Sequence, residues 1–249
     1  LIEQEEGVQN RLPGLLGLPV VNAPADVARA APDRIASLLD GIEGLVVARR
    51  ARAAPAEDSA AAVLEAMAGA GLAFPVLARP DGLAARTLRS RDDLAALPAN
   101  TAVTMVEHIP FADADGRWRK ARLFSLGGRL LPEHLAAGTD ATVQFGDGRA
   151  FQRAHPEEAA REGEFLERFE RHLGLARLAA AGEAAERLGL DILGLDVALL
   201  PQDRLLLIAA HPGLRAMLPD AREGFAHLQP ALGRISSAIC DLVLKRAGR

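Results

Sequence analysis

Short apolar runs rich in leucine, isoleucine and valine recur along the chain between polar turns, and runs of this length predict β-strands. Single strands are expected at residues 18–21, 45–48, 74–78 and 101–106, and paired strands at 118–126 with 129–136 and at 192–200 with 204–210. The strongest of these predictions is the hairpin across Gly127-Gly128, because two glycines suit the tight turns that join antiparallel strands. Residues 50–58, which are mainly arginine, alanine and proline, are expected to form a loop.

Other stretches place apolar residues three and four positions apart, which predicts helices. The expected helices lie at residues 27–39, 59–70, 90–94, 157–173, 175–188 and 230–246. Helices and strands are interleaved along the chain, but the two hairpins indicate antiparallel sheet. The sequence therefore predicts an α+β (mixed α/β) fold.

Composition narrows the class of protein. The chain has 249 residues, of which 49% are hydrophobic and 25% charged, so it is expected to fold around a real core. A net charge of −4 gives no electrostatic basis for binding nucleic acid or an anionic membrane. Because Cys240 is the single cysteine and no secretion signal is evident, we expect a cytoplasmic protein. Since the chain begins at Leu1 rather than Met, we expect a fragment or a processed product.

The strand at 118–126 carries the first candidate site. Alternation places Lys120 and Arg122 on one face, between Trp118 and Phe124. Two cations two residues apart on a strand lie about 7 Å from each other, which suits a polyphosphate or a pair of carboxylates. The alternative is a solvated edge strand whose charges discourage further pairing.

Asp196 lies in a strongly apolar strand, so its carboxylate needs a cation, a metal or several hydrogen-bond donors. Across the second hairpin we expect it to lie opposite residues 208–209, with His211 nearby. An ion pair with an arginine is the alternative to a metal, and His211 has the alternative of an ordinary surface histidine.

A series of segments along residues 17–217 is shared, in order and spacing, with a known family. They are residues 17–24 (GLPVVNAP), 41–49 (GIEGLVVAR), 74–80 (FPVLARP), 104–109 (TMVEHI), 115–122 (DGRWRKAR), 128–129, 132–136 (PEHLA) and 187–196 (RLGLDILGLD). In these the chain resembles the ATP-grasp ligases, in particular glutathione-synthetase-like and polyglutamate-ligase-like proteins attached to tetratricopeptide repeats. The most specific match is 115–136.

The resemblance implies two α+β subdomains whose antiparallel sheets flank a cleft. It implies a remnant of the preceding domain at 1–44, a first subdomain at 45–110 and a second at 111–249. The implied activity joins a small-molecule or peptide carboxylate to an amine through an acyl phosphate, with ATP and Mg²⁺. The implied roles are phosphate binding for Arg79 and Lys120, adenine and ribose recognition for Val106, Glu107 and Ile109, catalysis at the carboxylate or acyl phosphate for Arg122, and metal binding for Asp196 and His211.

Two departures from the family pattern bear on activity. The glycine-rich loop after the basic strand is reduced to residues 81–85 (DGLAA), and the Glu-x-Asn of the second metal strand is replaced by Ala209-Ala210-His211. Loss of a bridging carboxylate weakens a magnesium site. The alternative function is therefore a catalytically degenerate homologue, a pseudoenzyme that binds a ligand or serves as a protein scaffold.

The last helix carries Leu232, Ile235, Ile239 and Leu242 at spacings of three and four. Such a stripe fits either a helix packed on its own domain or a homodimer formed through this helix.

Overall fold

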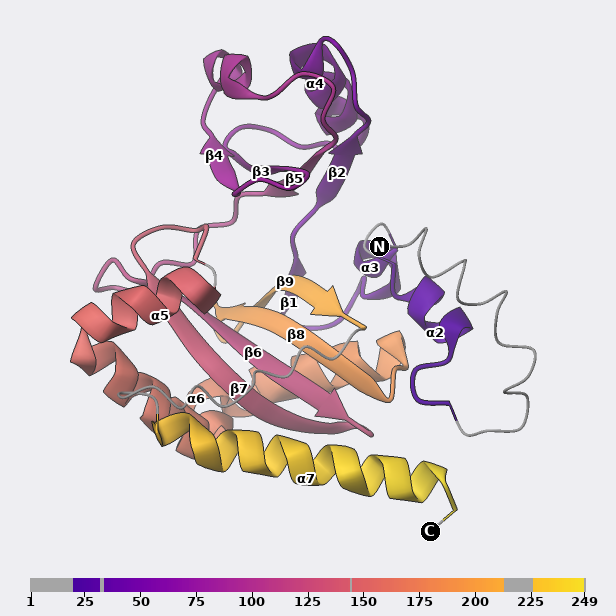
Figure 1. Ribbon diagram of the computed structural model, residues 1–249, viewed down its shortest axis with the longest axis vertical. Helices are drawn as coiled ribbons and strands as arrows, with labels where there is room; N and C mark the ends of the chain where they lie inside the picture. Colours follow the sequence, from indigo (N-terminus) through magenta and orange to yellow (C-terminus); the bar gives the residue numbers. More distant parts are fainter. Residues whose placement is uncertain (1–19, 32–33, 144, 213–225, 249) are drawn as a thin grey trace.

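The computed structural model describes residues 20–31, 34–143, 145–212 and 226–248 (Figure 1). Its strands form two sheets, a larger one in the order β1-β9-β8-β6-β7 and a smaller one in the order β2-β5-β3-β4. Figure 1 shows the smaller lobe standing above the larger sheet, to which extended chain segments connect it. Mostly antiparallel sheets combined with helices confirm the predicted α+β class.

The larger sheet is built around the two hairpins. Its strands are β1 (Leu45–Val47), β6 (Trp118–Leu126), β7 (Arg129–Gly138), β8 (Ile192–Leu199) and β9 (Leu205–His211). Gly127 and Gly128 connect β6 to β7 with φ angles of 57° and 87°. Both angles are positive, which glycine adopts without strain, so the predicted glycine turn is confirmed. The edge strand β1 joins the sheet by parallel pairing with β9.

The smaller lobe packs one helix against a four-stranded sheet. Its elements are β2 (Arg50–Ala53), α4 (Ser59–Gly69), β3 (Val76–Pro80), β4 (Arg86–Leu88), η2 (Arg91–Ala96) and β5 (Val103–Glu107). Val63 and Met67 of α4 pack on Val76 and Met105 of the sheet. The loop predicted at 50–58 is wrong in its first part, because residues 50–53 pair with β5 as strand β2.

The remaining helices pack around the larger sheet. They are α2 (Pro24–Arg29), α3 (Ile35–Leu38), α5 (Phe145–Ala154), α6 (Pro156–Leu188), η3 (Ala226–Leu228) and α7 (Gln229–Arg246). Leu173 and Leu188 of α6 pack on Leu123 and Leu195, which covers one face of the sheet. The boundary expected between two helices survives as a break inside α6 at Gly174, where φ is 75°.

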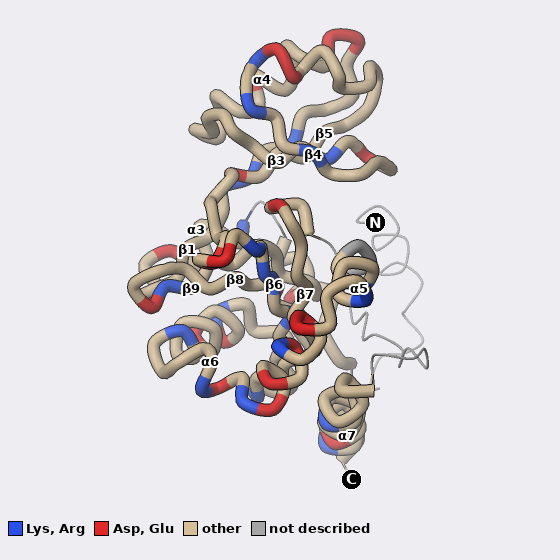
Figure 2. The backbone as a smooth tube through the Cα atoms, turned by 90° about the vertical axis from the view of Figure 1, so that its left-hand side faces the viewer, with Lys and Arg blue, Asp and Glu red and all other residues tan. Residues whose placement is uncertain are grey.

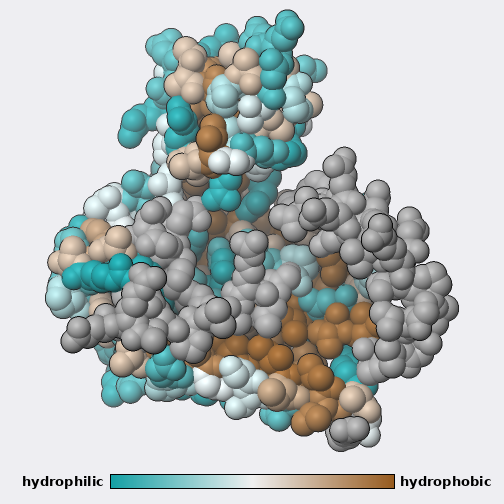
Figure 3. Space-filling view, in the orientation of Figure 1, coloured by the Kyte–Doolittle hydropathy of each residue, from teal (hydrophilic) through white to brown (hydrophobic). Residues whose placement is uncertain are grey.

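The C-terminal helix α7 packs on its own chain. Ile235 and Leu242 are buried against Phe124 and Leu131 of the hairpin, and Figure 3 shows apolar residues gathered beside this helix. The stripe is thus largely used within the chain, and a homodimer through α7 stays a prediction. Among the described residues, no helix is both long enough and apolar enough to cross a membrane.

Candidate functional site

Strand β6 carries the basic residues singled out from the sequence, and its pleat sorts them onto two faces. Lys120 and Arg122 lie on one face, where both contact Asp196 of β8. Arg119 lies on the other, where it forms ion pairs with Glu158 of α6 and two further carboxylates. This arrangement confirms the predicted alternation. The edge-strand alternative is wrong, because β6 is paired with β7 on one side and β8 on the other.

The buried carboxylate of Asp196 is the centre of this face. Arg122 donates two parallel hydrogen bonds to it, from Nε to Oδ1 at 2.7 Å and from Nη2 to Oδ2 at 3.0 Å. Lys120 Nζ lies 3.6 Å and His211 Nε2 lies 3.3 Å from Oδ2. Burial acts to raise the pKa of Asp196, but hydrogen bonds from His211 and Arg122 outweigh it and hold that pKa far below its ordinary value. Asp196 is therefore ionised, and the ion pair with an arginine is present.

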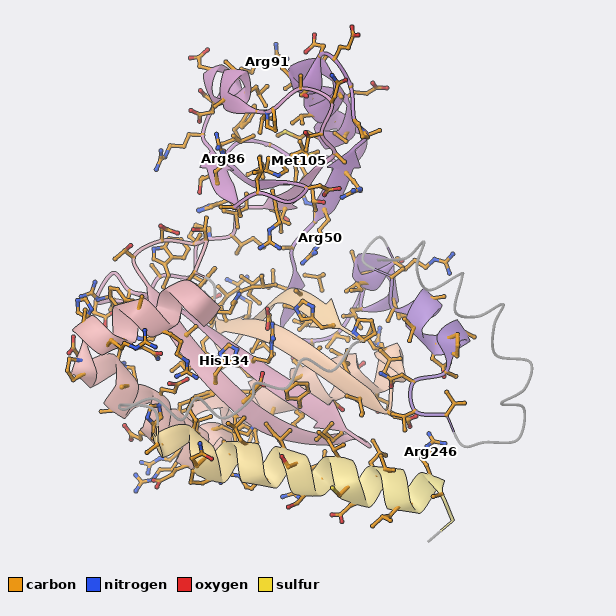
Figure 4. The ribbon with its side chains drawn as sticks, viewed as in Figure 1. Arg50, Arg86, Arg91, Met105, His134 and Arg246 are labelled. Atoms are coloured by element: carbon orange, nitrogen blue, oxygen red, sulfur yellow. The ribbon has the colours of Figure 1, made fainter. Side chains whose placement is uncertain are left out.

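Two further arginines approach this face from the smaller lobe. Arg50 begins β2 and donates a hydrogen bond to the backbone carbonyl of Ile208 on β9, and Figure 4 shows its side chain between the lobes. Arg79 lies on β3, on the face of the smaller sheet opposite the buried Ala78. Burial lowers the pKa of both Arg50 and Lys120, and the positive charge of Arg79 lowers each further. Arg50, Arg79, Lys120 and Arg122 are named here the cation cluster. Figure 2 shows Lys and Arg positions in blue on β6 and on the strands of the smaller lobe above it.

The charges of this group do not balance. Asp196 contacts Lys120 and Arg122, and the charge of Glu133 also acts on Arg122, so the four cations of the cluster exceed these two carboxylates. His134 of β7, which lies across from Arg122, is fully buried. Burial, followed by the charge of Arg122, holds the pKa of His134 well below its ordinary value, which keeps this ring neutral at pH 7. An anionic ligand would compensate the remaining charge.

An apolar cluster that spans both lobes lies next to the cations. Val106 of β5, Ile109, Trp118 of β6 and Ile208 of β9 are partly buried and pack against one cluster that includes Phe111. Such a wall can exclude water from one side of a ligand whose other side is charged. The cluster therefore complements the cation cluster as a surface for an amphipathic anion.

Glu107 lies at the junction of the two lobes. Arg49 Nη2 donates to its Oε1 at 2.5 Å, and Arg49 Nε donates to its Oε2 at 3.1 Å. The Arg49 hydrogen bond holds the pKa of Glu107 below its ordinary value. Since Arg49 precedes β2 and Glu107 ends β5, this ion pair ties together the two segments where the smaller lobe meets the larger sheet.

Two cavities are lined in part by residues of the larger sheet. A cavity of about 210 Å³ lies between the lobes, with Arg50, Val47 and residues 207–210 in its lining. A larger cavity of about 450 Å³ lies on the opposite face against α6, where Arg119 and Glu164 line it. One member of the cation cluster, Arg50, lines the smaller cavity.

No protein-family model matches the sequence, and no curated protein does so either. Solved structures do match. The D-alanine–D-alanine ligase from Coxiella burnetii is 12% identical, with a TM-score of 0.52 over 98% of this chain and 65% of that one. A RimK domain ATP-grasp protein from Sphaerobacter thermophilus is 20% identical, with a TM-score of 0.52 over 96% of this chain and 77% of that one. A RiPP-associated ATP-grasp ligase from Chryseobacterium gregarium, solved with ADP and a leader and core peptide, is 12% identical, with a TM-score of 0.52 over 98% and 69%.

The chain has the ATP-grasp fold. Identities this low establish the fold alone. The chain spans 65% of the length of the D-alanine–D-alanine ligase and of the peptide ligase PsnB, less than two thirds in each case. Activity and substrate therefore belong to the proposals below.

The ATP-grasp fold gathers the residues singled out from the sequence around one region. Four of them lie on the larger sheet, namely Lys120, Arg122, Asp196 and His211. Three lie on the smaller sheet, namely Arg79, Val106 and Glu107, and Ile109 follows its strand β5. Their roles toward ATP stay predictions. Sequence analysis missed Arg50 and His134. Arg50 lies in the stretch that was expected to form a loop. No sequence pattern around His134 predicts its burial, because that burial depends on the sheet around it.

A magnesium ion does not fit the described residues well. Magnesium prefers several oxygen ligands in octahedral order. Both oxygens of Asp196 accept from Arg122, and the residue across from Asp196 on β9 is Ala209. Within the described ranges, no three His, Cys, Asp or Glu side chains gather as a metal site would require. The metal roles of Asp196 and His211 stay predictions.

Proposed function

We propose that this chain binds ATP between its two lobes and uses it to join a carboxylate to an amine. The observation that supports this most directly is the cation cluster, in which Lys120 and Arg122 of the larger sheet contact Asp196 and Arg50 of the smaller lobe bonds to β9. A triphosphate is an anion whose several charges call for several cations. The fold, which is shared with ligases of peptides and amino acids, supports the same choice.

In this proposal the two parts of ATP meet the two parts of the site. The base lies against the apolar cluster of Val106, Ile109 and Trp118. Glu107, held in place by Arg49, faces the sugar or the edge of the base. Lys120 and Arg79 hold the phosphates by fixed positive charge, which lowers the cost of charge that develops during phosphoryl transfer.

The chemistry proposed is a two-step ligation. A carboxylate oxygen of the substrate attacks the γ-phosphorus, ADP leaves, and an acyl phosphate forms. The amine then attacks the acyl carbon, phosphate leaves with the amine proton, and an amide bond remains. Arg122 holds the carboxylate or acyl phosphate in this scheme, for which it would exchange Asp196 for the substrate. The substrate class proposed is a small-molecule or peptide carboxylate, since one neighbour of this fold was solved with a leader and core peptide.

A second candidate function is nucleotide binding without turnover. It is favoured by the bidentate pair of Arg122 with Asp196, which occupies both the proposed substrate-binding arginine and the one predicted carboxylate ligand. It is also favoured by Ala209 and Ala210, which offer no side-chain oxygen beside Asp196. The chain would then be an ATP-grasp pseudoenzyme that acts as a binding or scaffold protein.

Calorimetric titration of ATP into the full chain tests the shared part of both candidates. We expect Lys120→Met to weaken ATP binding about tenfold, which corresponds to about 1.4 kcal/mol, because a fixed charge near the phosphates is lost. Arg91→Met is the matched control, since Arg91 is exposed on η2 at the far end of the smaller lobe (Figure 4). Equal affinity in the two variants would contradict a phosphate site at Lys120.

Turnover separates the two candidates. ADP formation in the presence of pooled carboxylates and amines is measured with the same protein. ADP release that requires both substrates supports the ligase. Binding of ATP without ADP release under any combination supports the second candidate.

A further inference from the structure

The carboxylate of Asp196 is surrounded by three basic side chains. Arg122 engages both of its oxygens, at 2.7 Å and 3.0 Å, and Lys120 Nζ and His211 Nε2 lie beside Oδ2. The side chain is almost fully buried, with 6% of its surface exposed. A carboxylate in these surroundings already has its charge compensated by the protein itself, so it has little attraction left for a divalent ion.

Of the described residues, the two paired directly with Asp196 on β6 and β9 have no side-chain oxygen. On β9 the residue paired with Asp196 is Ala209, and on β6 it is Arg122. On β7 the carboxylate of Glu133 is fully buried. Burial acts to lower the pKa of Arg122, but the hydrogen bonds and charge of Asp196, and after them the charge of Glu133, raise that pKa. A dication placed at Asp196 would therefore meet Lys120 and Arg122 at close range, where repulsion between like charges is strong.

The same residues suit an anion that carries no metal. Lys120 and Arg122 approach from the larger sheet, whereas Arg50 and Arg79 come from the smaller lobe. Their four positive charges exceed the two negative charges of Asp196 and Glu133, and Arg50 is itself anchored to the backbone of β9. Fixed cations held by packing can neutralise phosphates without an added ion.

We propose that this cleft binds nucleoside polyphosphates without magnesium, with Arg122 acting as the resident cation on Asp196 in place of a metal. This inference rests on the proposed binding of ATP and specifies its ionic form. The ligand is the free, fully charged polyphosphate. Magnesium competes with the protein for the phosphate oxygens, because a bound dication removes two negative charges from the ligand.

The test is calorimetric titration of ATP into the full chain, first with EDTA and then with excess MgCl₂. We expect binding in EDTA that is about fivefold or more tighter than binding in magnesium, because the metal-free ligand carries more negative charge. Binding that requires magnesium would overturn this inference and leave the proposed function standing. No binding in either buffer would overturn the proposed function and this inference with it.

The variant Asp196→Asn tests independently whether Asp196 is a metal ligand. It removes one negative charge from the cluster while it keeps the shape of the side chain, so we expect ATP affinity in EDTA to rise several-fold. If Asp196 were a metal ligand, the same variant would abolish magnesium-dependent binding. Circular dichroism establishes that the variant is folded.

A titration of Mn²⁺ into the wild-type chain tests metal binding without any substitution. Electron paramagnetic resonance measures the free ion. We expect the signal of free Mn²⁺ to persist at micromolar concentrations of protein and ion. A loss of that signal on addition of the protein would overturn the inference.

Discussion

Arg119 illustrates how much a single buried charge depends on its partners. Its side chain is 6% exposed and forms ion pairs with Asp113, Asp115 and Glu158. Burial acts to lower the pKa of Arg119, but the hydrogen bonds that Arg119 donates to these carboxylates outweigh it and raise that pKa. The three partners come from the turn before β6 and from α6, so this residue fixes the helix and the turn to the sheet.

Arg119→Met is expected to destabilise the protein by about 3–5 kcal/mol, because Glu158 is then left buried without its arginine. The free energy of unfolding is measured by urea titration. Arg129→Met, an exposed position in the same hairpin, serves as the control and should change stability by at most about 0.5 kcal/mol. Equal losses in the two variants would contradict the structural role assigned to Arg119.

At the scale of elements, the β6–β7 hairpin determines where the site lies. Lys120 and Arg122 reach Asp196 because β6 is paired with β8 in the register Arg122↔Asp196. On its other edge β6 pairs with β7, and the turn at Gly127 and Gly128 sets the start of that pairing. The register of this pairing shifts between Arg122 and Leu123. A change in the turn therefore acts on the site through the strand.

Gly128→Val should destabilise the protein by about 1–2 kcal/mol, because a β-branched residue is strained at a φ of 87°. A Cβ at this position meets no atom within 4 Å, so the cost comes from the backbone and not from a clash. Gly128→Asn is the matched variant, since asparagine tolerates positive φ, and thermal unfolding should show a smaller loss for it. If Asn costs as much as Val, backbone strain is not the cause.

At the scale of the whole molecule, net charge and local charge have opposite signs. The chain carries −4 overall, yet the cation cluster concentrates positive charge between the lobes. Attraction for an anion is therefore a property of the fold, which brings residues of β2, β3 and β6 together. Composition alone would indicate an acidic protein that repels phosphates.

The affinity for ATP should fall several-fold as NaCl rises from about 0.1 M to about 1 M, since the screening length shortens from about 10 Å to about 3 Å over that range. Adenosine, which lacks phosphates, serves as the control ligand, and its affinity should stay nearly constant. Titration calorimetry at each salt concentration measures both. A salt-independent ATP affinity would contradict binding through the cation cluster.

Local periodicity was enough to predict the parts of the site that lie on single strands. Alternation with a period of two placed Lys120 and Arg122 on one face, and the β8–β9 hairpin placed Asp196 opposite Ala209 with His211 nearby. These contacts arise between residues close in sequence or paired across a short turn. Their geometry follows from the strand itself and from the turn length.

Other features were decided only by the tertiary structure. The strand β2 has the sequence RARA, without an apolar run, and it exists because β5 supplies hydrogen-bond partners for it. Arg50 thereby reaches the larger sheet, and β1 joins β9 across about 160 residues of chain. The sequence by itself determined the alternation, the turns and the stripes of helices, because each depends on neighbouring residues. The pairing of distant strands decided which charges meet, because that choice depends on the free energy of the whole chain.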